Sequence, residues 1–368
     1  MFALRATACH ALLVGLVLAQ APDPKSFFEK ALNAQQRGDY ATAVEQYRQV
    51  VKLSPDVLPA WINMGVALVQ LGQFQQAIDS YRSALALDPK NSQVRFYLAL
   101  AYYKKGDAGG AAKELESLLQ ADPNDIRVAV LLGDCYLRLG DSGRALVLVA
   151  PLARKASENL DLAWVYGTAL IANGKLREGA DVVERVGKEG KAADAYLLAG
   201  RTLLRLNLSE RARDDLEAAV RLNPNLPEVY TRLGSARERN ADYKGAAEAY
   251  RKAIEQNPRD LEAHLGLGGV LYFERDLVGA RSALEQALHI DPSSIAARYA
   301  MALVKKSAGE LEAASADLEA VVKANPNWLQ AHVELAAVYF RLHRTEDGAR
   351  ERKIVDRLSE EERKAGPR

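Results

Sequence analysis

The 368-residue sequence lacks an excess of charge of either sign. It has 49 lysines and arginines against 48 aspartates and glutamates, so the formal net charge is +1. Proteins that bind nucleic acids normally carry a basic excess or a basic stripe. The balanced charge therefore argues against nucleic acid as a partner. A helical-repeat nucleic-acid binder stays open as a disfavoured alternative.

Residues arranged for catalysis or metal binding are also scarce. The sequence has five histidines and two cysteines. The four histidines after residue 20 have no second histidine three or four residues away, and no cysteine or acidic pair stands at metal-ligand spacing. Neither GxSxG nor GxxxxGK[ST] occurs. We therefore expect no enzyme activity, no cofactor, no metal site and no small-molecule substrate.

Glycine-rich loops of the dinucleotide-binding kind are missing too. The one run that resembles them is Gly266-Leu267-Gly268-Gly269, and it lacks the later glycine of that motif. It falls inside an expected helix, so we interpret all of its glycines as packing residues. The lone histidines His264 and His332 take the place of Trp61 in their segments and are likewise interpreted as packing residues.

Long apolar runs are absent except at the N-terminus. Residues 11–19 (ALLVGLVLA) are all apolar, follow the basic Arg5 and end in small residues. This pattern is typical of a secretory signal peptide, and the run is too short for a comfortable membrane span. We predict a signal peptide over residues 1–19 and an exported protein, periplasmic or secreted. An uncleaved N-terminal anchor is the alternative. Cleavage would leave Cys135 as the only cysteine, without an intrachain disulfide.

What the sequence does contain is one unit repeated. In the stretch from Leu58 to Pro89, apolar residues at i, i+3, i+4 and i+7 mark a first helix, which Gly72 ends, and a second apolar stripe leads to Asp-Pro. The prolines that close such units are spaced by 34, or by 101 where two are missing: Pro55, Pro89, Pro123, Pro224, Pro258, Pro292 and Pro326. Two positions hold only Gly or Ala in every unit, represented by Gly65 and Ala77.

This period and pattern resemble the tetratricopeptide repeat family. The resemblance covers residues 24–358, as about ten helical hairpins, and implies an all-α, right-handed superhelix. Repeats four and five are irregular, and we predict local weakness at residues 148–192. Pro151 lies inside a second helix, which we expect to be kinked or shortened, and the glycines near Lys188 predict a weak helix. Residues 345–365 predict one long helix that caps the array.

The resemblance also implies a binding surface, because the first helix of each repeat lines a concave groove in this family. Arg138 and Lys104 should form a short positive row there, which favours a peptide with apolar anchors and a few acidic residues. The most probable contacts are in repeats three to five. The predicted groove residues are Phe96, Tyr97, Tyr103, Lys104, Asp134, Arg138, Trp164, Arg201, Arg205, Arg232, Arg239, Tyr272 and Phe273.

The expected function is therefore a non-catalytic scaffold or adaptor that binds a protein or peptide segment in the cell envelope. A membrane-associated assembly or secretion factor is a second interpretation, in which the partner belongs to a membrane complex. The sequence leaves the identity of the partner open.

Overall fold

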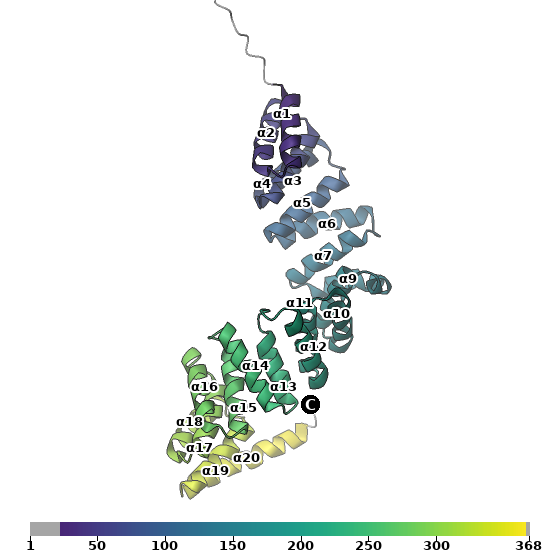
Figure 1. Cartoon of the computed structure of the whole chain (residues 1–368). Coiled ribbons are helices and arrows are strands. Elements are labelled where there is room, and N and C mark those ends of the chain that lie inside the picture. Colours follow the sequence, from purple (N-terminus) through teal and green to yellow (C-terminus); the bar gives the residue numbers. More distant parts are fainter. Residues whose placement is uncertain (1–22, 366–368) are drawn as a thin grey trace, which may run out of the picture. The chain divides into compact units, whose positions relative to one another are not determined.

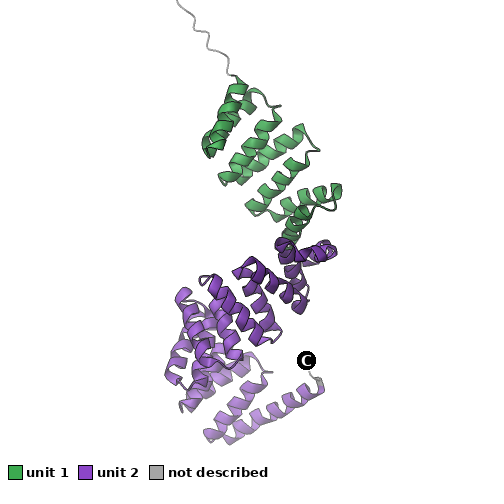
Figure 2. Cartoon of the chain, turned by 45° about the vertical axis from the view of Figure 1, so that its right-hand side comes forward, with its two compact units in different colours: residues 1–141 green, residues 142–368 purple. Residues whose placement is uncertain are grey.

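The computed structural model describes residues 23–365, and these residues form helices without any strand (Figure 1). The predicted signal peptide at residues 1–19 lies outside the described residues. The chain divides into two compact units, the first ending at Asp141 and the second beginning at Ser142 (Figure 2). Within each unit, consecutive helices pack against one another as antiparallel hairpins, which confirms the predicted all-α solenoid class.

The first unit contains three complete hairpins and the first helix of a fourth. Its helices are α1 (Pro24–Gln36), α2 (Tyr40–Leu53), α3 (Leu58–Gln70), α4 (Phe74–Leu87), α5 (Ser92–Lys105), α6 (Ala108–Ala121) and α7 (Ile126–Arg138).

The second unit begins with α8 and continues with six complete hairpins. Its elements are α8 (Ser142–Val149), the 3-10 helix η1 (Ala150–Ser157), α9 (Leu160–Ala172), α10 (Leu176–Gly190), α11 (Ala193–Arg205), α12 (Ser209–Leu222), α13 (Val229–Arg239), α14 (Tyr243–Gln256), α15 (Leu261–Phe273), α16 (Leu277–Ile290), α17 (Ile295–Ser307), α18 (Leu311–Ala324), α19 (Leu329–Arg341) and α20 (Thr345–Ala365).

A left-handed residue turns the chain between the two helices of each hairpin. Gly72 has φ +70°, as predicted, and five other repeats also use glycine there. Four repeats hold the same conformation without glycine, at Asn207, Ala241, Arg275 and His343. A side chain in this region of φ is strained. The packing of the two helices therefore imposes the turn even where the residue type does not favour it.

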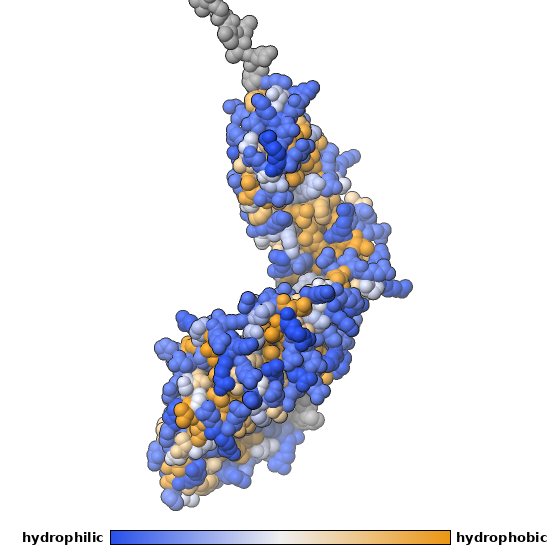
Figure 3. All heavy atoms as spheres, viewed as in Figure 1, coloured by the Kyte–Doolittle hydropathy of each residue, from blue (hydrophilic) through white to orange (hydrophobic). Residues whose placement is uncertain are grey.

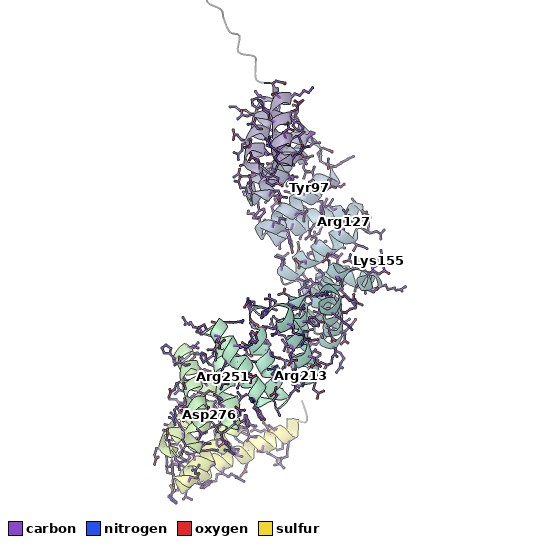
Figure 4. All side chains as sticks on the ribbon, in the orientation of Figure 1. Tyr97, Arg127, Lys155, Arg213, Arg251 and Asp276 are labelled. Atoms are coloured by element: carbon purple, nitrogen blue, oxygen red, sulfur yellow. The ribbon has the colours of Figure 1, made fainter. Side chains whose placement is uncertain are left out.

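Acidic and amide side chains begin many of the helices. Asp276, labelled in Figure 4, accepts a hydrogen bond from the backbone N–H of Gly279 at the start of α16. Asp39, Asp107 and Asp242 do the same at the second helices of their hairpins. Each bond satisfies an N–H that has no partner within the helix. The Asp-Pro or Asn-Pro ends and these caps together fix where one hairpin stops and the next begins.

The two helices of a hairpin meet at the predicted seam of small residues. Ala77 and Ala246 are fully buried. A Cβ on Gly65 would lie 2.5 Å from the Tyr81 ring, so the glycine is required for that ring to pack flat on the first helix. Gly200 and Gly268 face Leu216 and Leu284 in the same way. The sequence prediction of a close backbone approach is confirmed.

The irregular stretch of repeats four and five has the predicted break at Pro151, and its glycines lie within a helix. Helix α8 has only 8 residues and passes into η1, because Pro151 cannot donate the next α-helical hydrogen bond. Helix α10 nevertheless continues through Gly187 to Gly190 and has 15 residues. Gly187 is needed there because a Cβ would lie 2.9 Å from the Tyr196 ring. The segment is therefore helical as far as Gly190, and its lower stability relative to the other helices stays a prediction.

Helix α20 is the longest helix, with 21 residues, and covers the range expected from the sequence. It packs on α19 (Figure 1), where Leu358 is buried and His332 Nδ1 lies 2.6 Å from Glu351 Oε2. Most of its other side chains are charged and exposed. Among the described helices, none is both long and apolar enough to cross a membrane.

Candidate binding surface

The first helices of successive hairpins form one layer within each unit. In the second unit, α13 contacts both α11 and α15, and α17 contacts both α15 and α19. In the first unit, α3 contacts α5. Helices that approach directly across repeats lie on the inside of the bend of such a stack. The exposed side of this layer is therefore the concave face, and the predicted site residues belong to its helices.

In the first unit, Tyr103, Asp134 and Arg138 form a closed network across α5 and α7. The Tyr103 hydroxyl donates to Asp134 Oδ2 at 2.6 Å, and Arg138 Nε donates to the same oxygen at 2.6 Å. Arg138 also donates to the Tyr103 hydroxyl, and its guanidinium lies 4.4 Å from the centre of the ring. Burial raises the pKa of Tyr103 to about 12, and its hydrogen bond to Asp134 adds to the effect.

This network changes the predicted electrostatics. Arg138 was expected to form a positive row with Lys104, but Asp134 already balances its charge. Of the two residues of the predicted row, only Lys104 is exposed without an interaction with another described residue. The expectation of a free positive row is therefore wrong for Arg138, because the residue one turn before it in the helix is acidic and within reach.

Phe96 and Tyr97 are half-buried and have neighbours from adjoining repeats. The Arg127 guanidinium lies 5.9 Å from the Phe96 ring centre, and the Tyr97 ring centre lies 5.8 Å from that of Tyr81. Tyr97 and Arg127 are labelled in Figure 4 on neighbouring first helices, α5 and α7. Trp164, the other predicted aromatic anchor, is half-buried on α9 of the second unit.

In the second unit, two of the four predicted groove arginines belong to a ladder of alternating charges. Arg201 of α11 lies 3.8 Å from Glu228, and Arg232 of α13 lies 3.5 Å from the same carboxylate. Arg232 also reaches Glu262 of α15 at 2.5 Å. Glu228 has φ +64°, a left-handed conformation that is uncommon for glutamate. The ladder neutralises itself, so these arginines hold repeats together.

The other two arginines differ from each other. Arg239 Nη1 donates to the carbonyl of Leu204 at 2.7 Å and to Asn207 Oδ1 at 3.2 Å, and it thereby caps the end of α11 in the preceding repeat. Arg341 approaches the Lys306 carbonyl in the same way. Arg205 is exposed and has no described partner. Of the four, it alone remains available for a charged ligand.

The predicted aromatic residues Tyr272 and Phe273 do gather with a third ring that sequence reasoning missed. Phe273 stacks on Tyr243 of α14 with ring centres 5.2 Å apart and planes at 10°, and it meets Tyr272 edge-on at 6.0 Å. Phe273 is 59% exposed. We call Tyr243, Tyr272 and Phe273 the aromatic surface. In the view of Figure 3, apolar residues form separate patches on an otherwise hydrophilic exterior.

The aromatic surface continues toward the next repeat. Ser307 Oγ donates to the Tyr272 hydroxyl at 3.2 Å, and Tyr299 packs on Trp328 with ring centres 4.6 Å apart. Burial raises the pKa of Tyr299, and the nearby Glu334 and Tyr272 raise it further. Tyr243 and Trp328 could not be found from the repeat positions alone, because they stand at the ends of helices outside the six groove positions.

The glycines of α15 separate into two kinds. A Cβ on Gly266 would lie 2.3 Å from the Tyr250 ring, and one on Gly268 would lie 2.5 Å from Leu284, so both are packing residues as predicted. Gly269 is different, because the nearest atom to its Cβ position is Glu238 Oε1 at 4.0 Å. The interpretation of all the glycines in this run as packing residues is therefore wrong for Gly269.

Two histidines, His264 and His332, and the buried Cys135 behave as packing residues. His264 and His332 each place Nε2 3.0 Å from a proline carbonyl six residues earlier, where Trp61 places its indole nitrogen at 2.8 Å. Cys135 is fully buried, and burial raises the pKa of its thiol to about 11. Among the described residues, no group of three His, Cys, Asp or Glu side chains is placed to hold a metal ion.

Comparison with known families identifies these hairpins. Two models, both described as tetratricopeptide repeat, match the chain. One matches residues 28–92, 62–126, 166–227 and 231–295, and the other matches residues 102–164 and 271–337. Together they cover most of the chain. The chain belongs to the tetratricopeptide repeat family. Solenoids of this kind generally serve as scaffolds for protein interactions, with the concave surface as the binding face.

Three solved structures are similar to this chain. A tetratricopeptide repeat protein from Parabacteroides merdae ATCC 43184 is 18% identical, has a TM-score of 0.51, and matches over 67% of this chain and 98% of its own. Yeast Tom70 is 15% identical, with a TM-score of 0.40 over 92% of this chain and 91% of its own. MamA from Desulfovibrio magneticus RS-1 is 23% identical, with a TM-score of 0.43 over 46% of this chain and 96% of its own.

At this level of identity, the likeness to the Parabacteroides protein shows the fold alone. The search of curated proteins by sequence gave no match.

Proposed function

We propose that the protein is a non-catalytic scaffold that binds a segment of a partner protein on its concave face, with the aromatic surface as the main contact. Two features support this. The chain is a tetratricopeptide repeat array along nearly all its described length. Phe273 of the first helix α15 is also exposed and stacks on Tyr243 of the second helix α14, whereas the predicted arginines of the first helices are mostly engaged by neighbouring repeats.

The single observation that carries the proposal is the 59% exposure of Phe273. Its ring adjoins those of Tyr243 and Tyr272, and contiguous exposed apolar groups of this kind mark candidate interaction sites. Aromatic residues that become buried contribute most to the affinity of protein interfaces. Because Tyr243 fixes the ring orientation from the preceding hairpin, the surface needs little rearrangement to bind.

A photo-crosslinking amino acid at position 273 tests the proposal in the native cells. We expect it to capture one partner protein, and the same group at Glu285, exposed on the second helix α16, to capture none. Tyr272→Ala should weaken binding of the captured partner by about 2 kcal/mol, with unchanged helicity by circular dichroism. Crosslinking from position 285 but not from position 273 would move the interface to the outer face and contradict the assignment.

We further propose that the protein works outside the cytoplasm, as the apolar run at residues 11–19 indicates. Mass spectrometry of the protein from its native cells should find an N-terminus near Gln20, in the periplasmic or secreted fraction. An intact Met1 on membrane-bound protein would favour the uncleaved anchor, and an intact Met1 on cytosolic protein would refute export.

A further inference from the structure

Gly269, like Gly109, has an open Cβ position, so none of the described residues requires a glycine there. It lies in the middle of α15, where glycine destabilises a helix relative to alanine. The other helical glycines of this region are explained by rings or branched side chains within 3 Å of the Cβ position, as at Gly266 and Gly268. At Gly269 a methyl group would fit without any shift. The bare backbone at this half-exposed position would let another chain approach α15 closely.

The surroundings of Gly269 are those of a contact point. Tyr272 and Phe273 follow it by three and four residues, so they lie on the same face of α15. On the neighbouring helix α13, the Glu238 carboxylate faces the glycine with Oε1. A segment that crossed α15 at Gly269 would thus touch the aromatic surface on one side and a carboxylate on the other.

Glu238 is prepared for a cation. Its Oε2 accepts a hydrogen bond from the buried Tyr250 hydroxyl at 2.8 Å, which fixes the carboxylate, while Oε1 has no hydrogen-bond partner among the described residues. Its neighbour in the chain, Arg239, uses its guanidinium on Leu204 and Asn207 of the preceding repeat. Burial raises the pKa of Glu238 although the Tyr250 hydroxyl and the charge of Arg239 lower it, so a further cation at Oε1 would favour the ionised form.

From this placement we infer that the occupant of the concave face is an extended segment of a partner protein whose arginine or lysine pairs with Glu238, while a small residue beside it crosses α15 at Gly269. This inference rests on the proposed function, because it names the chemistry of the partner of the same surface. Arginine is the better fit, since its guanidinium can stack on the Phe273 ring as well as donate to Glu238. The occupant is thus basic at this point, in contrast to the acidic peptide expected from a Lys104 and Arg138 row.

The test uses the purified mature chain and arrays of extended nonapeptides in which the central residue and its neighbours are varied. We expect peptides with a central Arg beside Gly or Ala to bind at least tenfold more tightly than the same peptides with Glu or norleucine at the centre. Glu238→Gln should abolish this preference. Tyr250→Phe, which removes the hydrogen bond that orients the carboxylate, should reduce it.

Gly269→Ala provides the sharper measurement. The added methyl group should raise the thermal midpoint of α15 unfolding by roughly 1–2 °C, yet weaken binding of the selected peptide at least tenfold by steric exclusion. Gly109→Ala is the control, because Gly109 is exposed on the second helix α6 and its Cβ position meets only Asp107 Oδ1 at 3.8 Å. That variant should leave peptide binding unchanged.

Several results would overturn the inference. These are selection of neutral or acidic peptides, the absence of any selected peptide, a Gly269→Ala variant that binds normally, or one that unfolds more easily. If position 273 still crosslinks a partner in cells while the basic preference is absent, the chemistry assigned here fails and the proposed function stands. If position 273 captures no partner, the proposed function fails as well.

Discussion

Gly234→Leu is expected to lower the free energy of unfolding of the hairpin formed by α13 and α14 by about 3 kcal/mol. A Cβ at Gly234 would lie 2.6 Å from Cε1 of Tyr250, closer than side-chain carbons approach. Tyr250 is 2% exposed and donates to Glu238, so its ring cannot move aside without loss of that bond and of its packing. Urea denaturation followed by circular dichroism should show a lower midpoint for the segment around these helices.

Two further variants separate overpacking from a general effect of leucine. Gly109→Leu places the same side chain where the Cβ position is open, and its stability should change by less than about 0.5 kcal/mol. Tyr250→Ala in the Gly234→Leu background should cost much less than the sum of the two single changes, because the leucine fills the space of the ring. Additive costs, or a Gly234→Leu variant with the wild-type midpoint, would refute the close-approach argument.

Most of the fold could be predicted because the same pattern of apolar, small and proline residues recurs in each repeat. The spacing of the prolines and the small residues at positions such as Gly65 and Ala77 located the hairpins and their seam. The left-handed turns at Ala241 and His343 could not be predicted, because helix packing imposes a conformation that those residues do not favour. The contact between Gly187 and the Tyr196 ring could not be predicted either, because it depends on how the next repeat packs.

The candidate site was predictable as a face but not in its charges. Repeat position placed Tyr272 and Phe273 on the first-helix layer, and the structure brings them together. Position alone could not show that the Arg138 and Arg232 charges are balanced by acidic residues of the same or the next repeat. Nor could it distinguish Gly269 from Gly266 and Gly268, because the space at a glycine's Cβ position depends on which side chain of another helix lies opposite.

A second large effect is expected at Asp215, a buried acid without a basic partner. In repeat three, Arg95 pairs at 2.7 Å with Glu114, which follows it by 19 residues. In repeat six, the corresponding place before Asp215 holds Tyr196 instead of a base. Asp215 is 6% exposed, and its Oδ2 has no hydrogen-bond partner. The nearby Arg211 is engaged by Asp181 at 2.7 Å and by Glu184 at 2.5 Å.

Burial, and then the negative charge of Glu184, raise the pKa of Asp215 from 3.8 to about 7. The folded protein therefore holds a proton that the unfolded chain has lost between about pH 4 and pH 7. Stability must fall as the pH rises through this window, because the folded state binds more protons there. Above pH 7 both states are ionised and the full penalty remains, whereas below pH 4 both are protonated and no penalty applies.

Asp215→Asn should therefore stabilise the α11–α12 hairpin by about 2–3 kcal/mol at pH 8 and by little at pH 4.5, since a pKa difference of this size is worth about 4 kcal/mol before relaxation. Tyr196→Arg, which introduces a guanidinium at the place that Arg95 holds in repeat three, should reduce the pH dependence of stability in the same way.

Glu114→Gln is the matched control, and it should destabilise its own repeat at pH 8, because its carboxylate is already paired. Urea midpoints between pH 4.5 and 8 measure all three variants. An Asp215→Asn gain that is equal at both ends of this range would show that Asp215 keeps its charge throughout.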